Sequence, residues 1–196
     1  MFALYAVLIG ALLGLATGGR LSGLSELRFR WAGLALAGLI VQLLLFLPPI
    51  AERVGAAGAA IYVASSGLVL VAVLANLSIP GLKLAATGAA SNLVAITANG
   101  GYMPASPDAL AALGKEVGSA YSNSAVMPDP VLAGLTDIWA MPAWLPFANV
   151  FSIGDLLLAV GIGYATWHAM RRRPGASGNL PPMSHAVGTD GSWQRG

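Results

Sequence analysis

The sequence predicts an all-α membrane protein, a polytopic bundle of about five transmembrane helices. Of its 196 residues, 57% are hydrophobic and only 9% are charged, whereas a soluble domain carries roughly 25% charged residues. Stretches without acidic or basic side chains cover 1–19, 31–51, 54–82, 84–107 and 156–170. A helix that crosses a bilayer needs about 17–25 apolar residues. These stretches lack period-two alternation, which favours helices over strands.

We expect the spans, in chain order, at about 2–18, 31–50, 56–79, 82–99 and 151–170. The first span begins without the basic segment of a cleavable signal, so we expect it to be retained. The turn "SIPGLK" follows the third span and contains Pro80 and Gly81. It predicts that the third and fourth helices form an antiparallel hairpin.

The distribution of Lys and Arg over the connecting segments predicts the orientation, because cytoplasmic loops carry an excess of these residues. With the N-terminus outside, the outer segments contain only Arg53 and Lys115. The inner segments then contain Arg20, Arg28, Arg30, Lys83, Arg171, Arg172 and Arg173. We therefore predict an N-out, C-in topology. The same topology explains the sequence pI of about 9.2, so we expect no nucleic-acid partner.

The long external loop, 100–150, contains two kinds of signal. Its first part predicts a short helix with Ser106 as N-cap, Pro107 at the first position and Asp108 in the first turn. Its later part, "LTDIWAMPAWLPFANVF", is too interrupted by proline to span, and its aromatic rings suit the membrane interface. Loops this long are usually functional or disordered, and this one is a candidate surface for a protein partner.

Beyond the helical domain, 1–173, the tail 174–196 is rich in Gly, Pro and Ser. We expect it to be a disordered cytoplasmic segment. Immediately before it, Arg171, Arg172 and Arg173 predict a stop-transfer cluster that also contacts anionic lipids. The chain has no cysteine, which excludes disulfides and thiolate metal sites.

The predicted fourth helix carries a narrow stripe of small and polar residues, spaced alternately by four and three along one face. The stripe consists of Gly81, Ala85, Gly88, Asn92, Ala95 and Asn99. Two interpretations remain open. Small residues let helices approach closely while amides bond across the gap. Alternatively, the amides line a polar cavity, since polar groups inside a membrane often mark a pathway.

Polar residues on several predicted helices share the outer half of the membrane. Asn92 would lie about 10 Å below Asn99, and Gln42 has a similar depth, eight residues before the end of the second span. Asp155 enters the last helix about one turn from its outer end. These four residues are the predicted ligand-binding set. Asp155 has a second interpretation, because Ser152 precedes it by three residues as in a capping box.

Catalytic signals are few. His168 lies beside the arginine cluster and His185 lies in the tail, neither with an obvious acid or nucleophile. The sequence contains no HExxH, GxSxG or P-loop motif. We expect neither an enzyme nor a bound metal or cofactor.

Three stretches resemble a bacterial membrane family, domain of unknown function 5317. They are "GGRLSGLSELRFRW", "NLVAITANGGYMP" and "FSIGDLLLAVGIGYATW". The likeness extends from the first helix to about Arg173. It implies a multi-pass protein of the bacterial cytoplasmic (inner) membrane, and it places Gln42, Asn92, Asn99 and Asp155 at family positions. It implies no reaction or substrate.

Our leading hypothesis is an integral membrane protein that binds a small solute, ion or lipid headgroup in an outward-facing polar pocket. It would act as a transport or sensing component. The alternative is a structural or partner-binding membrane subunit without a ligand. An intramembrane enzyme acting on lipid ranks third, because one acid without a base, metal or nucleophile is poor equipment for catalysis.

Overall fold

The computed structural model describes residues 2–55, 57–115 and 123–172, and most of these residues are helical. Five longer helices form the body of the molecule: α1 (Phe2–Ala16), α3 (Ala32–Leu45), α5 (Ala57–Leu74), α6 (Leu82–Ala98) and α8 (Ile153–Arg171). The connections contain the short helices α2 (Ser22–Ser25), α4 (Pro48–Val54) and α7 (Pro107–Ala111) and a 3-10 turn, η1 (Ala133–Leu135). The predicted mostly helical class is confirmed. Arg173 and the predicted disordered tail lie outside the described residues.

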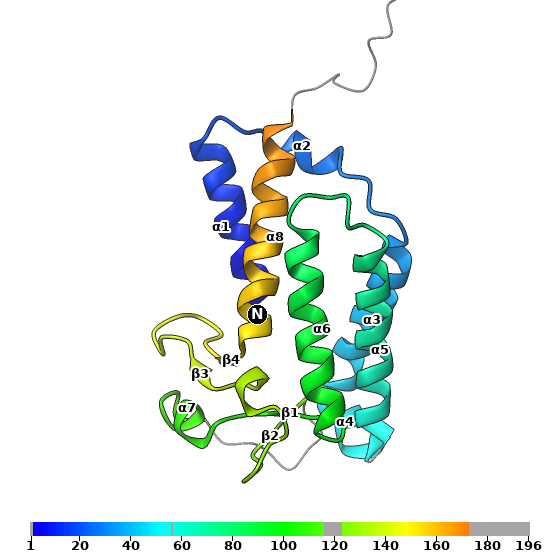
Figure 1. Cartoon of the computed structure of the whole chain (residues 1–196), viewed down its shortest axis with the longest axis vertical. Coiled ribbons are helices and arrows are strands. Elements are labelled where there is room, and N and C mark those ends of the chain that lie inside the picture. The colour runs from blue at the N-terminus through cyan, green and yellow to red at the C-terminus, as the bar shows by residue number, and fades with distance from the viewer. Residues whose placement is uncertain (1, 56, 116–122, 173–196) are drawn as a thin grey trace, which may run out of the picture.

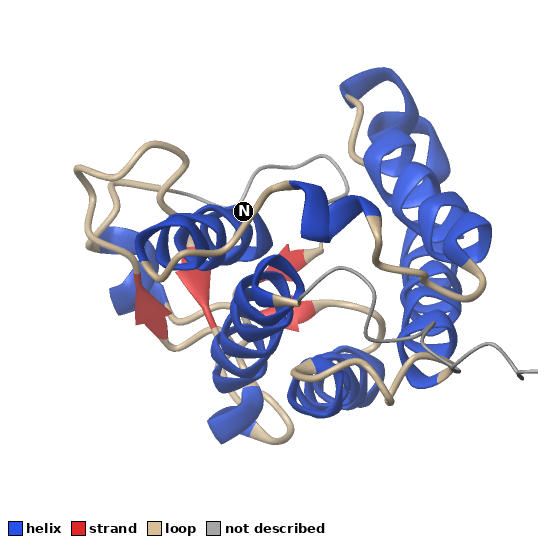
Figure 2. Ribbon diagram, turned by 90° about the horizontal axis from the view of Figure 1, so that it is seen from above, coloured by secondary structure: helices blue, strands red, loops and turns tan. Residues whose placement is uncertain are grey.

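The longer helices lie side by side in the order α1, α8, α6, α5, α3, and each contacts the next (Figure 1). The last helix of the described chain, α8, therefore lies between α1 and the other three longer helices. Figure 2 shows the same helices from above, close to end-on. The predicted hairpin is present as the antiparallel pair α5 and α6, and Gly81 begins α6 with a φ of 93° that glycine adopts without strain.

The small-residue stripe of α6 faces α8, where the two backbones approach closely. A Cβ atom added to Gly88 would lie 2.3 Å from the carbonyl oxygen of Gly154. One added to Gly81 would lie 2.3 Å from the carbonyl oxygen of Gly161. Glycine at these positions is what permits the contact, as the close-packing interpretation of the stripe requires.

The C-terminus of α6 ends as the Asn-Gly-Gly sequence predicts. Gly100 and Gly101 have φ values of 70° and 91°. The amide of Gly101 donates to the carbonyl of Ile96 (2.9 Å), and that of Gly100 donates to Thr97 (3.4 Å). This pair of bonds is a Schellman motif, which satisfies carbonyls that the helix itself leaves free.

Two predicted spans differ from the structure. The second, expected at 31–50, ends as a helix at Leu45, and α4 then leaves it at an angle of 86°. Pro48 and Pro49 explain the break, because proline donates no backbone hydrogen bond and disfavours helical geometry in the residue before it. The third, expected to reach residue 79, ends at Leu74 and continues in turns.

Among the described residues, α5 alone is long and apolar enough to cross a membrane by itself. The pair α3 and α4 meets the same length only when both are counted as one span. The structure thus contains one candidate span, and the five predicted spans and their orientation stay predictions.

The segment 100–150, predicted to be external and called the external segment below, contains short pieces of described chain that pair with one another. Strand β1 (Met103–Pro104) pairs in parallel with β2 (Ser124–Ala125), and β3 (Trp139–Ala140) pairs antiparallel with β4 (Val150–Phe151). The predicted short helix is present as α7, and its N-cap Ser106 accepts a hydrogen bond from the amide of Ala109. The proline-interrupted part forms no helical span, as expected.

Candidate functional site

The strongest polar contact between two long helices joins α6 and α8. The side-chain amide of Asn92 donates to Oδ1 of Asp155 at 2.9 Å. The hydroxyl of Ser152 lies 2.9 Å from the side-chain oxygen of Asn92. Both residues of α8 are positioned by its capping box, and Ser152 is fully buried. Two of the four predicted site residues therefore meet directly.

Both carboxylate oxygens of Asp155 already have partners. Oδ1 accepts the bond from Asn92, and Oδ2 accepts from the backbone amide of Ser152 at 3.1 Å. In return the hydroxyl of Ser152 accepts from the amide of Asp155 at 3.1 Å. The capping-box interpretation of Asp155 is confirmed. An acidic residue suits this position, because acidic side chains are favoured at helix N-termini.

A second acid, Asp137, lies in the external segment and was not among the predicted site residues. Its backbone is held between two neighbours: its amide donates to Pro104, and its carbonyl accepts from Ser106, both at 2.9 Å. The residue is only 6% exposed. Its Oδ1 atom is buried and has no hydrogen-bond partner among the described residues.

The surroundings of Asp137 favour its protonated form. Burial raises the pKa of its carboxyl to about 7, and the negative charge of Asp155 contributes in the same direction. Desolvation and a nearby like charge both disfavour ionisation. The two acids thus have opposite environments, one with its charge accepted by hydrogen bonds and one with an unsatisfied oxygen.

Gln42 belongs to a different contact. Its side-chain amide donates to the hydroxyl of Ser66 at 3.1 Å, which joins α3 to α5. It is not hydrogen-bonded to Asn92 or Asp155 in the described part of the chain. Because α3 ends at Leu45, Gln42 lies in the last turn of its helix rather than eight residues from the end.

Asn99 holds the external segment onto the end of α6. Its amide nitrogen donates to the carbonyl of Val131, and its oxygen accepts from the amide of the same residue, both at 2.8 Å. Asn76, at the opposite end of the bundle, pairs in the same two-bond manner with the backbone of Arg30, at 2.7 and 2.8 Å. In both cases an asparagine side chain imitates strand pairing and fastens a loop.

The sequence comparison bears on these same residues. Residues 26–167 match the family of unknown function DUF5317. The chain belongs to this family. No curated protein and no solved structure matches it. The match begins after α1 and stops before the arginine cluster, so it is shorter at both ends than the resemblance expected from the sequence.

The DUF5317 segment includes all four predicted site residues, but the structure distributes them over three separate contacts. Asn92 and Asp155 bond to each other, Gln42 bonds within the α3–α5 pair, and Asn99 fastens the loop. Sequence reasoning missed Asp137, whose only signal was an acid in the otherwise uncharged and mainly apolar stretch "LTDIW". No three His, Asp or Glu side chains converge as metal ligands in the ranges that the structure describes.

Proposed function

We propose that this DUF5317 protein is a multi-pass protein of the bacterial cytoplasmic membrane. The exposed faces of α1 and α3 support membrane embedding, because large apolar patches on a protein surface usually meet another apolar phase. Leu12 is 66% exposed and Leu43 is 68% exposed. In the external segment, Trp144 and Phe147 are 80% and 67% exposed. These rings suit the interfacial region of a bilayer.

The proposed topology has five crossings, by α1, α3 with α4, α5, α6 and α8, with the N-terminus outside. The predicted excess of Lys and Arg on one side supports this orientation. Reporter fusions after Arg172 test it: a cytoplasmic reporter should be active there and an exported phosphatase inactive. An active exported phosphatase at this position would refute the orientation.

Within this membrane protein, we propose that Asp137 reversibly binds a proton or a small cation as part of a transport or sensing activity. One observation carries the proposal: a carboxyl group buried to 6% exposure retains an oxygen without a hydrogen-bond partner in the described chain. Buried polar groups are nearly always paired. A cation on this oxygen would supply the missing partner, and a proton would remove the buried negative charge.

The neighbouring Asp155 supports a binding role, because its fixed negative charge attracts a cation towards the same region. Its own oxygens are occupied by Asn92 and Ser152, so Asp137 is the acid whose ligand can change.

Infrared spectroscopy of the purified full chain in detergent provides the first test. The wild type should show a protonated carboxyl band that disappears as the pH rises through about 7. The variant Asp137→Asn should lack this band. Asp129→Asn is the matched control, because Asp129 is an exposed acid of the same external segment. An unchanged band in Asp137→Asn would refute the assignment.

The cation is tested by thermal unfolding at pH 8, comparing sodium, potassium and choline chlorides with N-methylglucamine chloride at equal ionic strength. At least one cation should raise the melting temperature of the wild type and of Asp129→Asn but not of Asp137→Asn. Equal responses of all three proteins would refute cation binding. The infrared result would then decide whether a proton alone occupies the site.

A structural or partner-binding subunit without a ligand is the second candidate, and Asn99 favours it. The two hydrogen bonds between the Asn99 side chain and the Val131 backbone hold the external segment against α6. In this alternative, the external segment would present a surface to a protein partner. If Asp137→Asn is stable and keeps every measured response of the wild type, this candidate is preferred. Neither candidate includes a catalytic step.

A further inference from the structure

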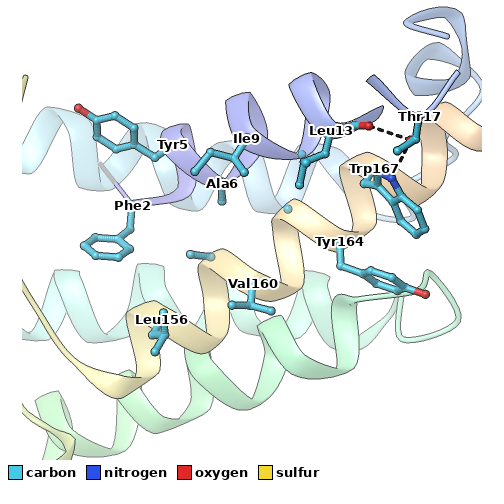
Figure 3. Close-up of a pocket in the computed structure, with 13 residues that line it drawn as sticks. Phe2, Tyr5, Ala6, Ile9, Leu13, Thr17, Leu156, Val160, Tyr164 and Trp167 are labelled. Carbon is cyan, nitrogen blue, oxygen red and sulfur yellow. Dashed lines mark hydrogen bonds between the residues drawn. The ribbon is translucent and has the colours of Figure 1, made fainter. Parts of the chain in front are cut away.

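The groove between α1 and α8 is a second feature, separate from the acid site. It has a volume of about 540 Å³, within the range of about 300–1,000 Å³ that is usual for small-molecule sites. Figure 3 shows its side chains, which are almost all apolar and include Ile9, Leu13, Leu156 and Val160. Helix α1 has 15 residues, so the groove runs about 22 Å along it. One leaflet of a bilayer contributes about 15 Å of hydrocarbon, so the groove is longer than one leaflet is thick.

Polar atoms lie at both ends of this groove. The hydroxyl of Tyr5 donates to the backbone carbonyl of Pro146 at the end near Phe2, and the polar atoms of Thr17 and Trp167 lie at the other end (Figure 3). There the indole nitrogen of Trp167 donates to the hydroxyl of Thr17 at 3.1 Å (Figure 3). Trp167 also borders an adjoining hollow of about 330 Å³, whose other lining residues are His168, Arg171 and Arg172. Trp167 therefore borders both the groove and the hollow.

Positive charge gathers at the Trp167 end. The guanidinium of Arg171 lies 5.3 Å from the centre of the Trp167 ring. Arg20 donates to the backbone carbonyl of Arg172 at 3.1 Å, which brings a third guanidinium to the same place. Among the described residues, none that lines either hollow is acidic. At the far end the groove is bordered by uncharged aromatic rings, where Phe2 packs 4.6 Å from Phe151.

We propose that this groove binds one anionic phospholipid, with an acyl chain between α1 and α8 and its phosphate beside Trp167, Arg171 and Arg172. The apolar length selects a lipid chain, and the charges select an anionic headgroup. The proposal rests on the membrane location proposed above but does not depend on the acid site. In the N-out, C-in orientation the lipid comes from the cytoplasmic leaflet.

Native mass spectrometry of the full chain tests the headgroup. Dioleoyl phosphatidylglycerol competes with dioleoyl phosphatidylcholine for the protein in detergent, and wild type should retain the anionic lipid preferentially. Each arginine near the headgroup contributes about fivefold, so the double variant Arg171→Gln/Arg172→Gln should lose about 25-fold of the preference. Arg28→Gln is the control, because Arg28 is exposed and lines neither hollow. An equal loss in the control would overturn the site.

A second variant tests the chain. Ala159 lines the groove, and Ala159→Phe should fill it and weaken binding of the dioleoyl lipid. Leu12→Phe is the control, because Leu12 is exposed on α1 outside the groove. Unchanged binding in Ala159→Phe would overturn the proposal. So would a dimer that this variant converts to monomer, because a second copy would then occupy the groove.

The two proposals fail in distinguishable ways. Recovery of the chain in the aqueous fraction without detergent would refute the membrane location itself. A detergent-dependent chain without preference for phosphatidylglycerol would refute the lipid groove alone.

Discussion

Replacing Gly88 with alanine tests whether close approach of α6 and α8 stabilises the bundle. The added methyl group would lie 2.3 Å from the carbonyl oxygen of Gly154 and 2.7 Å from the amide nitrogen of Leu158. Both are backbone atoms, so no side-chain rotation relieves the clash and the helices must separate. Overpacking of this kind costs about 1–3 kcal/mol.

Gly67→Ala is the matched control, because Gly67 is also helical and a Cβ there would meet nothing within 4 Å. Alanine is favoured over glycine inside a helix by about 0.5–1 kcal/mol. This gain applies to both variants, so their free energies of unfolding should differ by the overpacking cost alone, about 1–3 kcal/mol. For a chain of this length, 1 kcal/mol shifts the melting temperature by about 2–4 °C.

Thermal unfolding of the purified variants, followed by circular dichroism in one detergent, measures this difference. Gly88→Ala should melt at least about 2 °C below Gly67→Ala. Equal melting temperatures would refute the reasoning, because the two helices would then tolerate a methyl group between their backbones.

Three further predictions concern hydrogen bonds and charge. Asn99→Ala should remove both hydrogen bonds to the backbone of Val131 and lower the free energy of unfolding by about 1–3 kcal/mol, because a backbone amide loses its partner. Amide hydrogen exchange at η1 should become faster, and unchanged exchange would contradict the role of Asn99. Ser152→Ala should lower the free energy of unfolding by about 1 kcal/mol, because the N-cap of α8 is lost. Denaturant titration measures this difference, and a free energy equal to that of the wild type would contradict the prediction. Because the folded pKa of Asp137 is raised from 3.8 to about 7, folding binds a proton, so stability should fall as pH rises towards and through about 7. Melting curves from pH 4 to 9 check this, and Asp137→Asn should remove that part of the slope.

Much of the local structure was predictable because its signals act over three or four residues. The N-cap Ser106, the capping box of Ser152 with Asp155, and the glycines that end α6 are all present as expected. One boundary was predicted wrongly: the second helix ends at Leu45 rather than at residue 50, because Pro48 and Pro49 follow it. The apolar composition predicted helices correctly, but composition alone does not establish how many of them cross a membrane.

The candidate site was predicted only in part. Asn92 and Asp155 were selected by a shared depth, and they do bond across α6 and α8. Depth does not specify azimuth, however, so Gln42 at a comparable expected depth faces Ser66 on another helix. Asp137 could not be selected, because its burial depends on how the external segment folds back over the helices.

The sequence by itself determined the helical class, the helix caps, the small-residue stripe of α6 and the absence of cysteine chemistry. These follow from composition and from neighbours within one or two helical turns. Only the tertiary structure decided that α8 lies between α1 and α6, that buried Asp137 has an oxygen without a partner among the described residues, and that Trp167 meets Thr17. The physical reason is distance along the chain: Asn92 meets Asp155 across 63 residues and Trp167 meets Thr17 across 150, separations over which no local pattern specifies a partner.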